Sequence, residues 1–169
     1  IGFIIITGLD GENYAFVIAF GGIFGFLVYN LGVVGEKRRV FLGDNGSSFL
    51  GFFVAWACIY LSSTENNFFN PVTALWLVFI PFLDCMNVIL QRVRLGKKLF
   101  SPDRNHLHHL LMNRDINPLT VLGYIFLISL FFVFIGISLD YFGIGGSISL
   151  LLFFISGSIY LYFTQRLSE

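Results

Sequence analysis

The stretch PLTVLGYIFLISLFFVFIGISL, residues 118–139, is apolar almost throughout and contains no charged residue. About 20 such residues are enough for a helix to cross roughly 30 Å of hydrocarbon. Inside lipid the backbone must satisfy its own hydrogen bonds, so we expect each such stretch to be a helix. Five apolar stretches of suitable length occur, at residues 14–34, 47–63, 71–91, 118–139 and 144–164. The sequence therefore predicts an all-α, polytopic membrane helix bundle.

The composition agrees with this expectation. Of the 169 residues, 56% are hydrophobic and 12% are charged, whereas about 25% are charged in an average soluble domain. Ten basic residues balance ten acidic ones, which argues against a cationic nucleic-acid binder. Cys58 and Cys85 lie within predicted spans, which does not suggest a disulfide framework. We expect residues 1–169 to form a single integral-membrane domain.

The basic residues orient the predicted spans. All of them fall in or beside the loops after the first and third spans and after the fifth, and they are Lys37, Arg38, Arg39, Arg92, Arg94, Lys97, Lys98, Arg104, Arg114 and Arg166. The positive-inside rule makes these segments cytoplasmic. The opposite loops carry acidic residues such as Asp10 and Asp140 and no lysine or arginine. The N-terminus is then outside, and residues 1–7 are expected to be the end of a preceding span of a longer protein.

The first cytoplasmic loop contains VFLGDNGSS, residues 40–48, and its acidic residue at the membrane boundary is Asp44. Asp44 or Asn45 could cap the following helix, because both residue types accept hydrogen bonds from free N–H groups. Alternatively, Asp44 could hold a hard cation that accompanies a phosphate. Gly43 and Gly46 would let the backbone approach such a ligand. The two roles of Asp44 are compatible, and the local sequence leaves both open.

The second cytoplasmic loop contains all three histidines of the chain, His106, His108 and His109. On a helix, His106 and His109 would share a face while His108 would point elsewhere. Together with Arg104, the imidazoles could donate hydrogen bonds to a diphosphate. A zinc site is a weaker alternative, because structural zinc usually takes four ligands and no cysteine is near. Binding of anionic lipid by the basic loop would not need histidines.

Asp84 is a carboxylate inside an apolar span, which is energetically costly and suggests a function. Asn87 and Gln91 follow at helical spacing and would extend a polar stripe towards the cytoplasm. A hydrogen bond between helices of the bundle is an equally good interpretation of Asp84. Asn30, near the cytoplasmic end of the first span, raises the same question more weakly.

Three strings in this order resemble a known family. They are VFLGDNGSSFLGF at residues 40–52, PVTALWLVFIPFLD at residues 71–84 and FSPDRNHLHHLL at residues 100–111. The chain is similar to the bacterial polyprenyl-phosphate N-acetylhexosamine-1-phosphate transferases, which form glycosyl transferase family 4. The resemblance covers roughly Asn30 to Leu111. It is greatest to the branch that uses N-acetylglucosamine and initiates O-antigen and other cell-envelope polysaccharides.

The resemblance implies an activity and a set of roles. A sugar 1-phosphate would pass from a UDP-N-acetylhexosamine to a polyprenyl phosphate in the bacterial inner membrane, with release of UMP and with Mg²⁺ as cofactor. Asp44 falls on the family's metal-binding aspartate. The histidines at 106, 108 and 109 fall on its catalytic histidine motif, and Asn30 and Asp84 fall on polar positions that we assign to substrate binding together with Arg104.

Two departures from the family pattern concern the N-terminal side. The family has a pair of adjacent aspartates on an earlier cytoplasmic loop, and this sequence contains no such pair. A second family motif could be aligned with TGLDG at residues 7–11, but one predicted span separates Asp10 from Asp44 and puts them on opposite membrane faces. We therefore expect the remaining catalytic groups in a missing N-terminal half, and the fragment alone to be inactive. The alternative is a catalytically inactive membrane module that binds anionic lipid or nucleotide.

Overall fold

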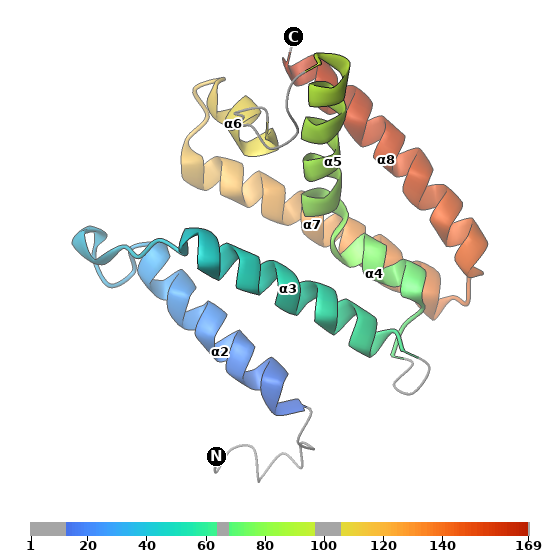
Figure 1. Cartoon of the computed structure of the whole chain (residues 1–169), viewed down its shortest axis with the longest axis horizontal. Coiled ribbons are helices and arrows are strands. Elements are labelled where there is room, and N and C mark those ends of the chain that lie inside the picture. The colour runs from blue at the N-terminus through green and yellow to red at the C-terminus, as the bar shows by residue number, and fades with distance from the viewer. Residues whose placement is uncertain (1–12, 64–67, 97–105, 169) are drawn as a thin grey trace. The chain divides into compact units, whose positions relative to one another are not determined.

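The computed structural model describes residues 13–63, 68–96 and 106–168, and these residues form helices without any strand (Figure 1). This confirms the predicted all-α class. The helices are α2 (Asn13–Asn30), α3 (Gly43–Leu61), α4 (Pro71–Leu77), α5 (Phe79–Arg94), α6 (Leu107–Met112), α7 (Pro118–Tyr141) and α8 (Gly146–Ser168), with a short 3₁₀ turn at Glu36–Arg38. The chain divides into two compact units, residues 1–54 and residues 55–169, and α3 crosses the boundary between them.

Helices α7 and α8 are long and apolar enough to cross a membrane, and the pair α4 and α5 becomes a third candidate if it forms one broken span. Most apolar side chains of α7 and α8 point outward, as expected for surfaces in contact with lipid. The other two predicted spans are helices that do not meet this criterion. The apolar part of α2 is shorter, and α3 begins with the polar sequence GDNGSS. Two or three of the five predicted spans are thus supported.

The third predicted span is not one straight helix, because α4 and α5 are bent by 75° relative to each other. The helical hydrogen-bond pattern breaks at Val78, whose φ is −109° and ψ is 20°. Pro81 follows in the first turn of α5; it has no N–H for the Leu77 carbonyl, and its ring crowds that carbonyl. A proline is tolerated in the first turn of a new helix but not in the interior of a continuous one. The helix therefore ends and restarts at this point.

Two helices of the second unit begin with the same Asn-Pro pair. The side chain of Asn70 accepts a hydrogen bond from the Val72 N–H at the start of α4, and Asn117 accepts one from Leu119 at the start of α7. Both prolines occupy the first helical position, where their missing N–H has no intrahelical partner to lose. The predicted spans 71–91 and 118–139 therefore begin at the helix starts that these Asn-Pro pairs cap.

The core of the second unit surrounds the bend between α4 and α5. Trp76 and Phe79 are each 1% exposed, and the indole N–H of Trp76 donates to the Ser149 hydroxyl of α8 over 3.0 Å. The Phe79 ring stacks on Phe132 of α7 with a centroid distance of 3.7 Å. Gly136 of α7 lies against the Trp76 side chain with no room for a Cβ atom. The bend is thus packed against both long helices, which fixes the direction of α5.

Replacement of Gly136 should test this packing. In Gly136→Ala the new methyl group would overlap Trp76, and we expect a loss of about 1–3 kcal/mol in the free energy of unfolding. The matched control is Gly123→Ala in the same helix, where nothing lies within 4 Å of the added atom and alanine should be neutral or slightly stabilising. Denaturant unfolding of the chain in detergent, followed by tryptophan fluorescence, measures both. Equal stability of the two variants would contradict the packing described here.

Candidate functional site

The Asp84 carboxylate of α5 joins that helix to the histidine segment. One of its oxygens, Oδ2, lies 2.9 Å from Nδ1 of His106, and the other, Oδ1, accepts a hydrogen bond of 2.8 Å from the backbone N–H of Leu107. The Asp84 side chain is 16% exposed and that of His106 is 36% exposed. A carboxylate removed from water is costly unless its oxygens are hydrogen-bonded, and here both are. Asp84 therefore anchors the start of α6 to α5.

The three histidines form a row of neighbouring rings. The rings of His106 and His108 are nearly parallel with centroids 5.9 Å apart, and those of His108 and His109 are 4.1 Å apart. The prediction that His106 and His109 share a face while His108 points elsewhere is therefore wrong. His106 precedes α6 in an extended conformation, with φ −68° and ψ 148°, so helical spacing does not apply to it. His108 instead lies between the other two.

The electrostatics of this row favour a neutral ring at His108. Partial burial lowers the pKa of His108, and the neighbouring His109 and His106 lower it further, against an opposing effect of Asp84. A lower pKa means that the imidazole is neutral over more of the range around pH 7. Because His108 is itself exposed, it remains available to solvent or to a ligand. The neighbouring imidazoles of this row therefore differ in their electrostatic environment.

Leucines on the other side of α6 fix the short helix in place. Leu107 and Leu110 are each 6% exposed, and Leu107 belongs to the core cluster of Trp76 and Phe79. Leu111 packs against the same cluster. These leucines thus pack into the second unit. Apolar packing holds α6 next to α7 and α8, and the Asp84 hydrogen bonds hold it to α5.

Further polar groups occur beside Asp84. Asn87, one turn further along α5, is completely buried, and its Oδ1 accepts a long hydrogen bond of 3.5 Å from Gln91. The predicted polar stripe of α5 is therefore present. The hydroxyl of Tyr160 on α8 lies near the Asp84 carboxylate without meeting hydrogen-bond geometry, and sequence reasoning missed this residue. Tyr160 belongs to an apolar helix far along the chain, so no local pattern identified it.

Asp44 belongs to the first unit and is exposed in the first turn of α3. It does not cap the helix as its sequence position allowed, because α3 already begins at Gly43. Its backbone carbonyl instead accepts a hydrogen bond from the Ser47 hydroxyl over 2.9 Å. Among the described residues no group hydrogen-bonds its carboxylate. Negative charge is favourable near a helix N-terminus, and this carboxylate is free to act as a ligand.

The segment before α3 is held by its own contacts. The side-chain amide of Asn30, at the end of α2, donates to the Val40 carbonyl over 3.0 Å. Gly43 has a φ of +67°, which lets the chain turn into α3, and a side chain at Gly46 would collide with Leu42. These residues were predicted to bind substrate or admit a ligand. The structure shows that they shape the chain around Asp44.

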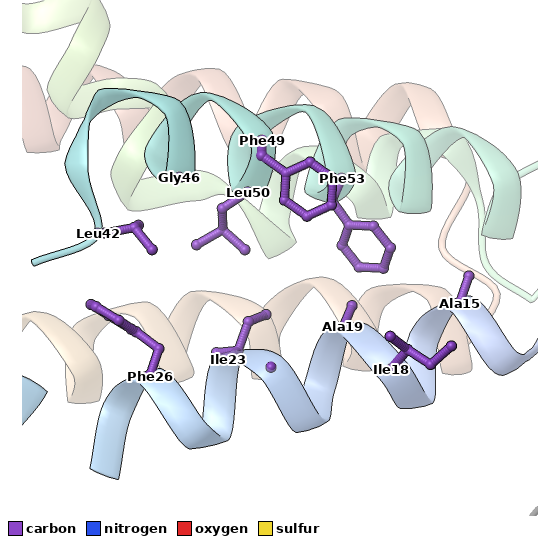
Figure 2. Close-up of a pocket in the computed structure, with 11 residues that line it drawn as sticks. Ala15, Ile18, Ala19, Ile23, Phe26, Leu42, Gly46, Phe49, Leu50 and Phe53 are labelled. Carbon is purple, nitrogen blue, oxygen red and sulfur yellow. The ribbon is translucent and has the colours of Figure 1, made fainter. Parts of the chain in front are cut away.

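A groove of about 560 Å³ with an almost entirely apolar surface lies between α2 and α3 in the first unit (Figure 2). It is lined from α2 by residues including Ala19, Ile23 and Phe26 and from the α3 side by residues including Leu42 and Phe49. Such a lining offers nothing that could recognise a nucleotide or a sugar. The polar chemistry of the described chain is therefore outside this groove.

The donor set for a divalent cation is partial. Among residues 13–63, 68–96 and 106–168, no group of three or more histidine, cysteine or acidic side chains is arranged to hold a metal ion. Mg²⁺ usually takes one or two carboxylates and completes its shell with water and substrate phosphates. The exposed Asp44 fits one such ligand. Arg104 and Asp10, which also carried predictions, lie outside the described residues.

Comparison with known proteins identifies relatives. A family model described as "Glycosyl transferase family 4" matches residues 1–62, which include Asn30 and Asp44. An undecaprenyl-phosphate alpha-N-acetylglucosaminyl 1-phosphate transferase of Salmonella typhi is 34% identical over 140 residues, which is 81% of this chain and 38% of the relative. The protein of the same name from Escherichia coli K12 is 34% identical over 139 residues, with 80% and 38% covered.

A third relative has a higher identity over a shorter alignment. The transferase of the same name from Yersinia pestis is 45% identical over 89 residues, covering 52% of this chain and 24% of the relative. No solved structure matches the chain. The chain thus spans well under half the length of these curated relatives, and most of its own length is matched. Its similarity to glycosyl transferase family 4 thus extends over residues 1–62 by the family model and over about four fifths of the chain by these relatives.

Proposed function

We propose that this chain is the C-terminal part of a transferase that moves N-acetylglucosamine 1-phosphate, or a related N-acetylhexosamine 1-phosphate, from a UDP-sugar to undecaprenyl phosphate. UMP is the other product, and the lipid-linked sugar initiates a cell-envelope polysaccharide such as O-antigen. The observation that carries this proposal is the similarity, over about four fifths of the chain, to enzymes named for that transfer. The apolar helices are consistent with a membrane-embedded acceptor lipid.

The roles follow from the chemistry of the side chains. Phosphoryl transfer needs positioning of the reacting groups and neutralisation of the charge on phosphate oxygens. Asp44 would hold Mg²⁺, which when bound neutralises the diphosphate of the UDP-sugar. The histidine row at 106, 108 and 109 supplies hydrogen-bond donors for phosphate oxygens from one rigid segment. Arg104 adds a guanidinium group two residues before that row.

Further catalytic groups are proposed to come from an N-terminal segment of the same protein. Among the described residues, no group of three or more histidine, cysteine or acidic side chains could hold a metal ion. In addition, no adjacent aspartate pair occurs in the 169 residues. We therefore expect the isolated chain to release no UMP in detergent with UDP-N-acetylglucosamine, undecaprenyl phosphate and Mg²⁺. UMP release by this chain alone would instead show that it holds a complete site.

Asp44→Asn in the longer transferase should separate catalysis from stability. Loss of a metal-binding carboxylate should lower turnover by about 10²-fold or more. The cost to folding should be only about 0.3–1 kcal/mol, because Asp44 is exposed and loses only its interaction with the helix N-terminus. UMP release and thermal unfolding of the purified enzyme measure the two effects.

The matched control for this variant is Asp115→Asn. Asp115 is exposed and has a positive φ of 59°, a conformation that asparagine adopts readily. Its replacement should leave turnover unchanged. Full activity of Asp44→Asn would remove Asp44 from the metal site, and an inactive wild-type transferase would favour a non-catalytic membrane module instead.

The cytoplasmic location of the motif loops can be tested by cysteine labelling in intact cells. In a background without Cys58 and Cys85, a cysteine replacing Asn66 should react with a membrane-impermeant maleimide. A cysteine replacing Arg38 should react only after permeabilisation, because the basic loops are assigned to the cytoplasm. Labelling of position 38 from outside would overturn this orientation and separate the motifs from cytoplasmic UDP-sugars.

A further inference from the structure

We propose that Asp84 is a positioning residue that fixes one proton of the His106 ring on Nδ1, so that Nε2 is the ring atom that gains or loses a proton and, when protonated, donates it to a phosphate oxygen. This inference rests on the proposed transfer of a sugar phosphate. It gives Asp84 a role different from the direct substrate contact that its sequence suggested.

The hydrogen bonds of Asp84 determine which ring nitrogen is protonated. The backbone N–H of Leu107 can only donate, so Oδ1 of Asp84 must accept. An ionised carboxylate only accepts, so Oδ2 also requires a donor, and its neighbour at 2.9 Å is Nδ1 of His106. Nδ1 therefore carries a proton whether the ring is neutral or charged. The ring nitrogen that gains or loses a proton is therefore Nε2.

The opposite edge of the His106 ring is available to a ligand. Among the described residues, none hydrogen-bonds Nε2, and the side chain is 36% exposed. The ring is parallel to that of His108, which burial and the neighbouring imidazoles keep neutral over more of the pH range. An anion at this edge would meet His106 before it met Asp84, because the carboxylate is only 16% exposed. Nε2 is thus the accessible atom of this pair.

A direct contact between Asp84 and a diphosphate is disfavoured. Both carboxylate oxygens already accept hydrogen bonds from consecutive residues, and like charges would repel. Among the described residues, the Tyr160 hydroxyl of α8 is a further neighbour from a different helix, and it is buried. Asp84 can therefore act on a substrate through His106, as a carboxylate that orients an imidazole does in other sites.

Asp84→Asn should move the proton of the neutral His106 ring from Nδ1 to Nε2 while keeping the link between α5 and α6. The amide oxygen would stay with the Leu107 N–H, which needs an acceptor, and the amide NH₂ would then face Nδ1. Nδ1 would have to accept, and the ring proton would move to Nε2. The variant keeps the shape of residue 84 and the anchoring of α6 but blocks proton exchange at Nε2.

The first measurement is the ¹⁵N NMR spectrum of the imidazole groups of this chain in lipid nanodiscs, with the His106 signals assigned by their loss in His106→Gln. We expect the proton of neutral His106 on Nδ1 in the wild type and on Nε2 in Asp84→Asn. Asp115→Asn serves as the matched control and should leave the His106 signals unchanged. A wild-type ring protonated on Nε2 would overturn the proposal, even if the Asp84 variant failed to fold.

The second measurement is turnover of the longer transferase. Asp84→Asn should lower UMP release by about 10²-fold, the lower range for loss of a positioned acid or base, with unfolding temperature little changed. Reversal of the ring proton with full turnover would overturn the catalytic part of the proposal. An inactive wild-type enzyme that still shows Nδ1 protonation would contradict the proposed function but not the Asp84 and His106 arrangement.

Discussion

The packing of Trp76 and Phe79 at the junction of α4 and α5 is the constraint on which the second unit depends. Because Gly136 leaves space for the Trp76 side chain and Phe132 stacks on Phe79, the junction lies directly against α7. The hydrogen bond from Trp76 to Ser149 adds α8. Once this junction is fixed, the direction of α5 is fixed too. The aromatic contacts therefore also determine where the polar side chains of α5, including Asp84, are placed.

Asp84 adds a polar contact at the edge of this apolar core. A carboxylate in a poorly hydrated environment must find donors, and the donors here are consecutive groups at the start of α6. Leu107 secures the same point by packing into the core. The histidine row is therefore held by one polar and one apolar anchor that are adjacent in sequence. Such double attachment gives a short helix of six residues a defined orientation that its own hydrogen bonds could not provide.

In the first unit the position of the acidic residue depends on local turns and not on a packed core. Asp44 is exposed, and its position comes from the local turn at Gly43 and from the link between Asn30 and Val40. Its chemistry is that of a free carboxylate at a helix N-terminus, whereas Asp84 is engaged on both oxygens. Two acidic residues that looked comparable as motif positions thus differ in what they can bind. The Asp44 carboxylate is exposed, whereas both oxygens of the Asp84 carboxylate contact His106 and Leu107.

The sequence by itself determined the helical class, the helix starts at Asn70 and Asn117, and the segments that carry the site, because hydropathy, capping and charge are local properties. It identified Asp44, Asp84 and the three histidines as the residues of interest. It did not reveal the bend near Pro81, although that proline was a usable signal. Only the tertiary structure brought His106 and Tyr160 to Asp84, since these contacts join residues 22 or more positions apart through the packing of separate helices.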